Sequence, residues 1–327
     1  MFPRSRLRLA LAAVLAASAD ASFRRYFRVT PEAPALGERT LIAMDAPPPA
    51  EDCRPFVRIA SMLLDAGVHA PRVLAQDLDR GFLLLTDLGT TTYLAALDET
   101  NAQALFADAT DALIRWQQAT RPGALPPYDD ALLSRELMLF PEWYVGRHLG
   151  AEMSDAERND LARIFDLLIA DHLAQPRVFV HRDYMPRNLM VSEPNPGVLD
   201  FQDAVEGPIT YDILSLYKDA FRSWPEEFAL DGTIRYWEKA RREGLPVDPD
   251  FAAFHRAGEW MGLQRHLKVL GIFARIRHRD GKAGYVEDTP RFLAYVRPVA
   301  QRYAAFGPLA RLLDRLEART PRFGYTF

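Results

Sequence analysis

The sequence predicts an α+β protein with two lobes, a small strand-rich N-terminal lobe over residues 1–90 and a larger, mainly helical C-terminal lobe over residues 91–327. Three observations lead to this expectation. Short apolar runs bounded by turn residues fill the first 90 positions, helical periodicity prevails afterwards, and polar residues collect on loops between 178 and 212. We expect a hinge between the lobes near residues 86–92.

The N-terminal lobe is expected to hold four short strands and one helix. Turn-rich residues 31–37 separate the first two strands, and three consecutive prolines at 47–49 precede the helix, which ends at a glycine. The expected strands are Phe23–Val29, Thr40–Met44, Val73–Ala75 and Gly81–Thr86, and the expected helix is Arg54–Asp65.

The C-terminal lobe is expected to be built mainly from helices. Ser154 and Glu157 have the spacing of a capping box, which marks a helix start. The expected helices are Ala102–Gln118, Leu132–His148, Ser154–Leu173, Ile213–Phe221, Gly232–Arg242, Phe251–Arg277 and Pro290–Leu316.

The composition is that of a folded protein with a full core, since 49% of the 327 residues are hydrophobic and 26% are charged. The formal net charge of −4 argues against a nucleic-acid partner, because such proteins usually carry a basic surface. Cys53 is the single cysteine, which excludes an intrachain disulfide and a cysteine-cluster metal site. Arginine dominates the 40 basic residues, and no lysine precedes Lys218.

Three polar residues stand on loops at the ends of short strands: Asp183, Asn188 and Asp200. Phosphoryl transfer from ATP needs a carboxylate that orients the acceptor hydroxyl and takes its proton, and oxygen ligands for Mg²⁺. Asp183 is the candidate catalytic base, and Asn188 and Asp200 are the candidate metal ligands. The run from His181 to Asn188 has the kinase spacing of Asp followed by Asn five positions later. His181 itself is interpreted as a structural residue that holds the loop.

Residues 181–188, His-Arg-Asp-Tyr-Met-Pro-Arg-Asn, resemble the signature of the aminoglycoside phosphotransferase/choline kinase superfamily. Residues 200–212 resemble the metal-binding segment of the same superfamily. The resemblance implies a protein-kinase-like fold that uses ATP and Mg²⁺, with Asp212 supporting the catalytic loop. Asp212 is equally compatible with a helix N-cap.

Three further segments, 20–28, 44–48 and 265–271, resemble the bacterial anomeric kinases of amino sugars. That resemblance implies phosphorylation of the C1 hydroxyl of N-acetylmuramate or N-acetylglucosamine in cell-wall recycling. Two alternatives stay open: an aminoglycoside or other small-alcohol phosphotransferase, and an inactive nucleotide-binding pseudokinase.

The expected ATP site lacks the lysine that most related kinases carry on the third strand, where Met44 stands here. Arginine is the substitute we expect, because guanidinium binds phosphate bidentately and stays charged. The candidates are Arg24, Arg25 and Arg28, with Ser22 as a further donor. By resemblance, segment 81–89 holds adenine through the backbone near Thr86 and Leu88.

The acceptor site is expected to hold a small-molecule sugar in a monomeric protein. A basic wall on the long helix, with Arg265 and Lys268, would suit an anionic lactyl sugar better than a cationic antibiotic. The further candidates for sugar contact are Asp203, Glu206 and Trp224.

Residues 4–21 fit either a secretory signal or a first helix, because arginines precede a short apolar run. We expect the helix, since residues 22–29 fit a nucleotide site and ATP chemistry belongs in the cytoplasm. The other segments fall short of transmembrane length. We therefore expect a cytoplasmic protein with no membrane partner.

Overall fold

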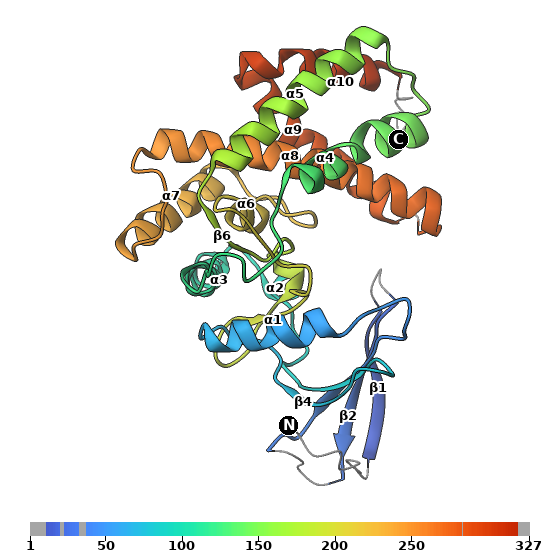
Figure 1. Cartoon of the computed structure of the whole chain (residues 1–327), viewed down its shortest axis with the longest axis vertical. Helices are drawn as coiled ribbons and strands as arrows, with labels where there is room; N and C mark the ends of the chain where they lie inside the picture. Colours follow the sequence, from blue (N-terminus) through green and yellow to red (C-terminus); the bar gives the residue numbers. More distant parts are fainter. Residues whose placement is uncertain (1–10, 20–22, 33–36, 283, 320–327) are drawn as a thin grey trace. The chain divides into compact units, whose positions relative to one another are not determined.

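The structure is a computed structural model that describes residues 11–19, 23–32, 37–282 and 284–319 (Figure 1). It divides into two compact units, the first comprising residues 1–119 and 186–204 and the second residues 120–185 and 205–327. The boundary expected at residue 90 stays a prediction about the lobes. The first unit of the structure extends past that boundary, because it also takes in residues 91–119 and residues 186–204, which begin within the motif 181–188.

The first unit is built on a five-stranded antiparallel sheet in the order β1-β2-β3-β5-β4. Figure 1 shows α1 running beside this sheet, and α1 buries Phe56, Ile59 and Leu63, the apolar side expected from the sequence. The strands are β1 Leu11–Ala19, β2 Arg25–Pro31, β3 Leu41–Asp45, β4 Val73–Asp77 and β5 Phe82–Thr86. The helices are α1 Arg54–Asp65, α2 Tyr93–Ala96 and α3 Ala102–Gln118.

The first helix expected near the N-terminus is wrong, because Leu11–Ala19 is strand β1. It pairs antiparallel with β2 from Leu11 opposite Pro31 to Ala19 opposite Arg25. Its leucines and alanines favour a helix, but pairing along the edge of β2 supplies backbone hydrogen bonds that override this weak preference.

The second unit is mainly helical around α8, which spans Phe251–Asp280. Gly271 of α8 packs so closely on the chain before the π-helical segment that an added Cβ would lie 2.3 Å from the Leu139 carbonyl oxygen. The other helices are α4 Asp130–Leu137, α5 Asp155–Ala174, α6 Tyr211–Tyr217, α7 Glu226–Arg242, α9 Thr289–Arg302 and α10 Gly307–Arg319. Strands β6 Arg177–Val180 and β9 Val205–Pro208 pair antiparallel.

Two helices expected as continuous are interrupted. The expected helix 132–148 divides into α4 and a π-helical segment, Phe140–His148, which has a proline in its first turn. The expected helix 290–316 divides at Tyr303, whose backbone is extended, and Gly307–Pro308 then starts α10. The capping box is confirmed, because Ser154 caps α5 and exchanges hydrogen bonds with Glu157.

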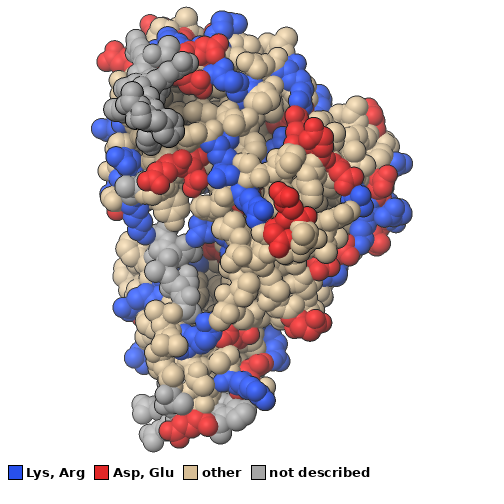
Figure 2. Space-filling view, turned by 180° about the vertical axis from the view of Figure 1, so that it is seen from behind, with Lys and Arg blue, Asp and Glu red and all other residues tan. Residues whose placement is uncertain are grey.

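On the face shown in Figure 2, acidic and basic side chains are interspersed rather than gathered by sign. Among the described residues, no helix combines the length and the apolar character that crossing a membrane would require.

Candidate active site

A cavity of about 260 Å³ lies within the first unit. Residues of β2, β3 and β5 line it together with residues next to the short strands β7 Leu189–Met190 and β8 Gly197–Val198. Its lining includes the following polar residues: Arg28, Thr86, Asp87, Arg187, Asn188 and Asp200. The cavity therefore joins the expected adenine segment and the expected metal ligands in one unit.

A two-strand hairpin brings Asn188 and Asp200 together, although they are twelve residues apart in the chain. Strand β7 follows Asn188 and pairs antiparallel with β8, and the Leu199 amide donates to the Asn188 carbonyl at 2.9 Å. The Asn188 Nδ2 lies 3.4 Å from Asp200 Oδ2, and Gln202 Nε2 donates to Asp200 Oδ1 at 2.8 Å. Asp200 has a φ of 61°, a left-handed conformation that few residues other than glycine adopt and that often marks functional sites.

The pair of Asn188 and Asp200 fits a magnesium ion shared with phosphates. Mg²⁺ in nucleotide sites takes one or two protein oxygen ligands and completes its shell with phosphate and water. An asparagine and an aspartate side by side on the cavity wall provide oxygen atoms of this kind. In the described part of the chain, no group of three or more His, Cys, Asp or Glu residues forms a self-sufficient metal site.

Thr86 and Leu88, the predicted adenine contacts, both line the cavity. The Thr86 amide donates to the Arg72 carbonyl at 3.1 Å, and the Thr86 hydroxyl accepts from the Arg72 amide at 2.9 Å. The Thr86 amide is therefore already engaged, and adenine contact at its backbone would fall to the carbonyl oxygen or to Leu88.

Each of the three predicted arginines faces a carboxylate. The pairs are Arg24 with Glu51 at 3.0 Å, Arg25 with Asp45, and Arg28 with Asp87 through Nε at 2.5 Å and Nη2 at 2.9 Å. Arg28 lines the cavity, whereas the side chain of Arg25 is 64% exposed. Met44, at the expected lysine position, is 1% exposed in β3. Ser22 lies outside the described residues.

Arg187 is a cavity residue that sequence reasoning missed. It stands directly before Asn188, in the short 3-10 helix Pro186–Asn188. Its place inside the catalytic-loop motif, next to a predicted metal ligand, could have indicated from the sequence that Arg187 lies near the phosphates. A cation at this position suits the phosphates that a metal at Asn188 would bind.

The catalytic loop of the second unit is held by Asp212. Both carboxylate oxygens accept backbone amides, from His181 at 2.7 Å and from Arg182 at 3.0 Å. The Asp183 amide in turn donates to Nδ1 of His181 at 3.3 Å, which agrees with a structural role for this histidine. Asp212 lies inside the first turn of α6, whose N-cap is Thr210, so the alternative that Asp212 is an N-cap is wrong.

Asp212 is fully buried, at 0% exposure. Burial raises the pKa of Asp212 to about 7, while the two amides and the nearby Arg265 favour its ionised form. The backbone of Arg182 is left-handed, with a φ of 76°. The hydrogen bond that its backbone N–H donates to Asp212 helps to hold that conformation.

The four predicted sugar contacts have different surroundings. Asp203 is exposed in the first unit. In the second unit, the Glu206 carboxylate accepts the Gly123 amide at 2.8 Å, and Trp224 stacks on Phe228. Arg265 is 2% exposed on α8, and its charge acts on Asp212 and Asp219. Contact with a sugar stays a prediction for all four.

The predicted basic wall is wrong for Lys268. This residue is 6% exposed, and its Nζ donates to the Tyr211 hydroxyl at 2.7 Å and lies 3.6 Å from Glu136. Its charge is balanced inside the second unit, because α8 places it against α4 and α6.

A hairpin that places an asparagine beside an aspartate on a cavity wall, after a loop with a further aspartate, is the arrangement expected of the class of kinase-like phosphotransferases. Solved structures share the fold. An ethanolamine kinase from Plasmodium vivax aligns with a TM-score of 0.61 and 12% identity over 88% of this chain and 82% of that one. An ADP-bound aminoglycoside phosphotransferase aligns with a TM-score of 0.53 and 16% identity over 87% and 93% of the two chains.

Residues 13–248 match the model of the phosphotransferase enzyme family, and the chain belongs to this family. The N-acetylmuramate/N-acetylglucosamine kinase of Pseudomonas aeruginosa is 57% identical over 305 residues, 93% of this chain and 89% of that protein. The kinase of the same name from Neisseria meningitidis serogroup B is 50% identical over 92% of this chain and 89% of that protein. The superfamily and the kinase-like α+β fold predicted from the sequence are thereby confirmed, and the inactive alternative loses its support.

Proposed function

We propose that this phosphotransferase uses ATP to phosphorylate the C1 hydroxyl of N-acetylmuramate or N-acetylglucosamine, in the recycling of cell-wall sugars. The observation that carries the substrate class is the 57% identity with two Pseudomonas proteins named for these sugars, over 93% of the chain. The structure supports the proposed phosphoryl transfer, because a hairpin holds Asn188, a predicted metal ligand, beside Asp200 on the cavity wall.

In the proposed reaction, the Asp183 carboxylate orients the sugar hydroxyl and accepts its proton. The hydroxyl oxygen forms a bond to the γ-phosphorus as the bond between that phosphorus and the β,γ-bridging oxygen breaks, and ADP leaves. Asn188 and Asp200 would hold Mg²⁺, which neutralises charge on the phosphates when bound. We also propose that the protein works as a monomer in the cytoplasm, where ATP is available.

A coupled assay of ADP release tests the substrate class. We expect turnover with both amino sugars, no turnover with choline or kanamycin, and loss of turnover in Asp183→Asn. Efficient turnover of kanamycin without turnover of either sugar would refute the proposal.

A blocked substrate tests the position of transfer. The methyl glycoside of N-acetylglucosamine keeps its other hydroxyls but has no free C1 hydroxyl, so we expect no ADP release with it. The ³¹P spectrum of the product from the free sugar should show coupling to the anomeric proton. Turnover of the methyl glycoside would place the transfer at another hydroxyl.

A further inference from the structure

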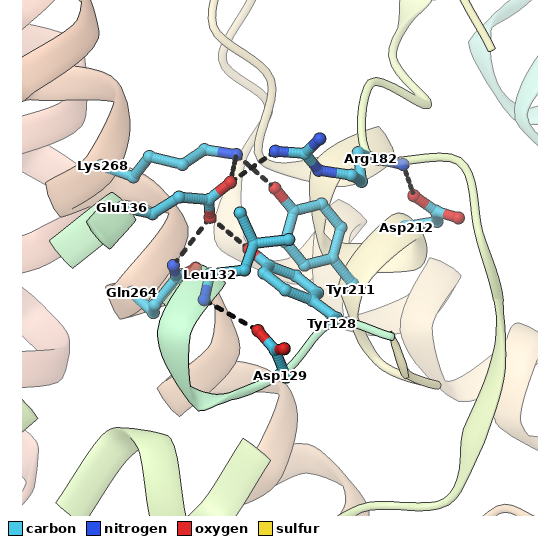
Figure 3. A network of polar contacts seen from close by, with 9 residues as sticks. All are labelled: Tyr128, Asp129, Leu132, Glu136, Arg182, Tyr211, Asp212, Gln264 and Lys268. Carbon is cyan, nitrogen blue, oxygen red and sulfur yellow. Dashed lines mark hydrogen bonds and ion pairs between the residues drawn. The ribbon is translucent and has the colours of Figure 1, made fainter. Parts of the chain in front are cut away.

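Glu136 of α4 is a buried carboxylate on which four side chains from different parts of the second unit converge (Figure 3). It is 5% exposed. Its Oε2 accepts hydrogen bonds from the Tyr128 hydroxyl and, at 3.1 Å, from Gln264 Nε2. Its Oε1 lies 2.5 Å from Arg182 Nη2 and 3.6 Å from Lys268 Nζ.

Within this cluster, the two cations outnumber the single carboxylate that they share. Glu136 contributes one negative charge, whereas Arg182 and Lys268 contribute two positive charges in a largely buried space. Burial lowers the pKa of Lys268, but the negative charges of Glu136 and Asp183 act against it and leave that pKa raised. Loss of the Glu136 charge would leave two buried cations facing each other.

The same cluster fixes the residue that immediately precedes the predicted base. Asp212 binds the Arg182 backbone amide, and Glu136 binds the far end of the Arg182 side chain. Figure 3 shows these two carboxylates reached from opposite ends of Arg182. Lys268 adds a link to α6, the helix that carries Asp212, through the Tyr211 hydroxyl at 2.7 Å.

We propose that Glu136 and Lys268 are positioning residues for phosphoryl transfer. They hold the guanidinium of Arg182, and the fixed Arg182 sets the direction in which Asp183 presents its carboxylate. This role rests on the proposed function of Asp183 as the base. Neither residue needs to touch ATP or the sugar, so their loss should lower kcat and leave the KM for ATP unchanged.

Three variants and a control distinguish two roles for the cluster: positioning the catalytic loop through its charges, or only stabilising the fold. Glu136→Gln keeps the shape and removes the charge, Lys268→Met removes one cation, and the double variant removes both. The control is Glu259→Gln, on α8, since Glu259 is 3% exposed and also binds an arginine and a tyrosine hydroxyl. All kcat values are referred to the folded fraction, measured by circular dichroism.

We expect Glu136→Gln to lower kcat by about tenfold or more, because small displacements of a catalytic group are costly. Lys268→Met should lower kcat less, since the negative charge of Glu136 still neutralises the positive charge of Arg182. The double variant should recover at least about fivefold in kcat over Glu136→Gln, because coupled charges are not additive. The KM for ATP should stay within about twofold throughout, and the control should keep the parental kcat.

The proposal is overturned if the double variant is as slow as Glu136→Gln, or if the Glu259→Gln control loses as much kcat. Should Glu136→Gln fail to fold, Lys268→Met and Tyr211→Phe decide, because a parental kcat in both would refute the proposed role. Asp183→Asn is measured in parallel. Retained turnover in that variant would refute the proposed base, whereas an inactive Asp183→Asn with a fully active Glu136→Gln would refute the positioning role alone.

Discussion

Replacing Asp212 by asparagine tests whether the catalytic loop depends on this buried carboxylate. The carboxylate accepts amides at 2.7 and 3.0 Å, from His181 and Arg182. Asparagine keeps one acceptor oxygen, but its NH₂ group would face the second amide, donor against donor. At least one hydrogen bond to a charged group is lost, which is worth about 1.5–3 kcal/mol.

If the loss of this hydrogen bond displaces the loop and raises the activation free energy by the same amount, kcat decreases roughly 10- to 150-fold. The conversion is that about 1.4 kcal/mol corresponds to a tenfold change in rate. The assay is coupled ADP release at pH 8, where Asp212 is ionised, with saturating ATP and sugar. The KM for ATP should stay near the parental value, because the cavity proposed for the nucleotide is lined by residues of the first unit, whereas Asp212 belongs to the second.

Asp219→Asn is the matched control for this prediction. Asp219 is also 0% exposed and accepts a backbone amide, that of Ala220 at 2.6 Å, but this bond lies outside the catalytic loop. We expect the control to lose stability and to keep kcat within about threefold. The reasoning is refuted if Asp212→Asn retains kcat within a factor of about two, or if both variants lose kcat equally.

Burial raises the pKa of Asp212 to about 7, so the folded protein holds a proton between roughly pH 4 and 7 that the unfolded chain releases. The free energy of unfolding contributed by this group should therefore fall as pH rises through that window, and urea titrations of Asp212→Asn should lack this dependence. Arg28→Ala and Arg187→Ala should each raise the KM for ATP about tenfold, because both arginines line the cavity. Arg25→Ala should leave this KM unchanged, because the side chain of Arg25 is exposed. Equal KM values for all three variants in nucleotide titrations would contradict the assignment of the cavity to ATP. Gly271→Ala should lower the melting temperature measured by calorimetry, since its Cβ would lie 2.3 Å from a backbone oxygen and overpacking costs about 1–3 kcal/mol; an unchanged temperature would mean that the helix contact can adjust.

Local patterns in the sequence predicted most of the elements. Helices Arg54–Asp65 and Ala102–Gln118 begin and end where periodicity and flanking residues placed them. The misses have long-range or context-dependent causes. Residues 11–19 became a strand because β2 offers an edge, and no local pattern reports a pairing partner. The helical pattern after Leu132 continued through Pro141, although the regular α-helix ended at Leu137.

For the site, the sequence predicted the residues whose spacing is fixed by one short loop. Asn188 and Asp200 meet because two-residue strands pair between them, joined by a turn that contains the sequence Pro-Asn-Pro at residues 194–196. The partner of Arg182 was not foreseeable, because Glu136 lies 46 positions earlier on another helix. The burial of Lys268 was not foreseeable either. Helical periodicity shows which residues share one face of a helix, but it does not show that a carboxylate such as Glu136 packs against that face.

The way Arg28 is held supports our proposal that an arginine takes the place of the lysine that the N-terminal lobe lacks. Kinases of the usual type orient their lysine with a glutamate, and Asp87 serves Arg28 in a similar way, since it binds both Nε and Nη2. Arg28 also donates Nη2 to the Gly89 carbonyl at 2.7 Å, and among the described residues its Nη1 donates to no acceptor. A guanidinium has five donors, so one fixed by a carboxylate keeps a pre-oriented end for phosphate, which an ammonium on the same strand would offer less directionally. The pairing with Asp87 thus supports phosphate binding by Arg28, because it fixes the geometry while leaving donors to spare.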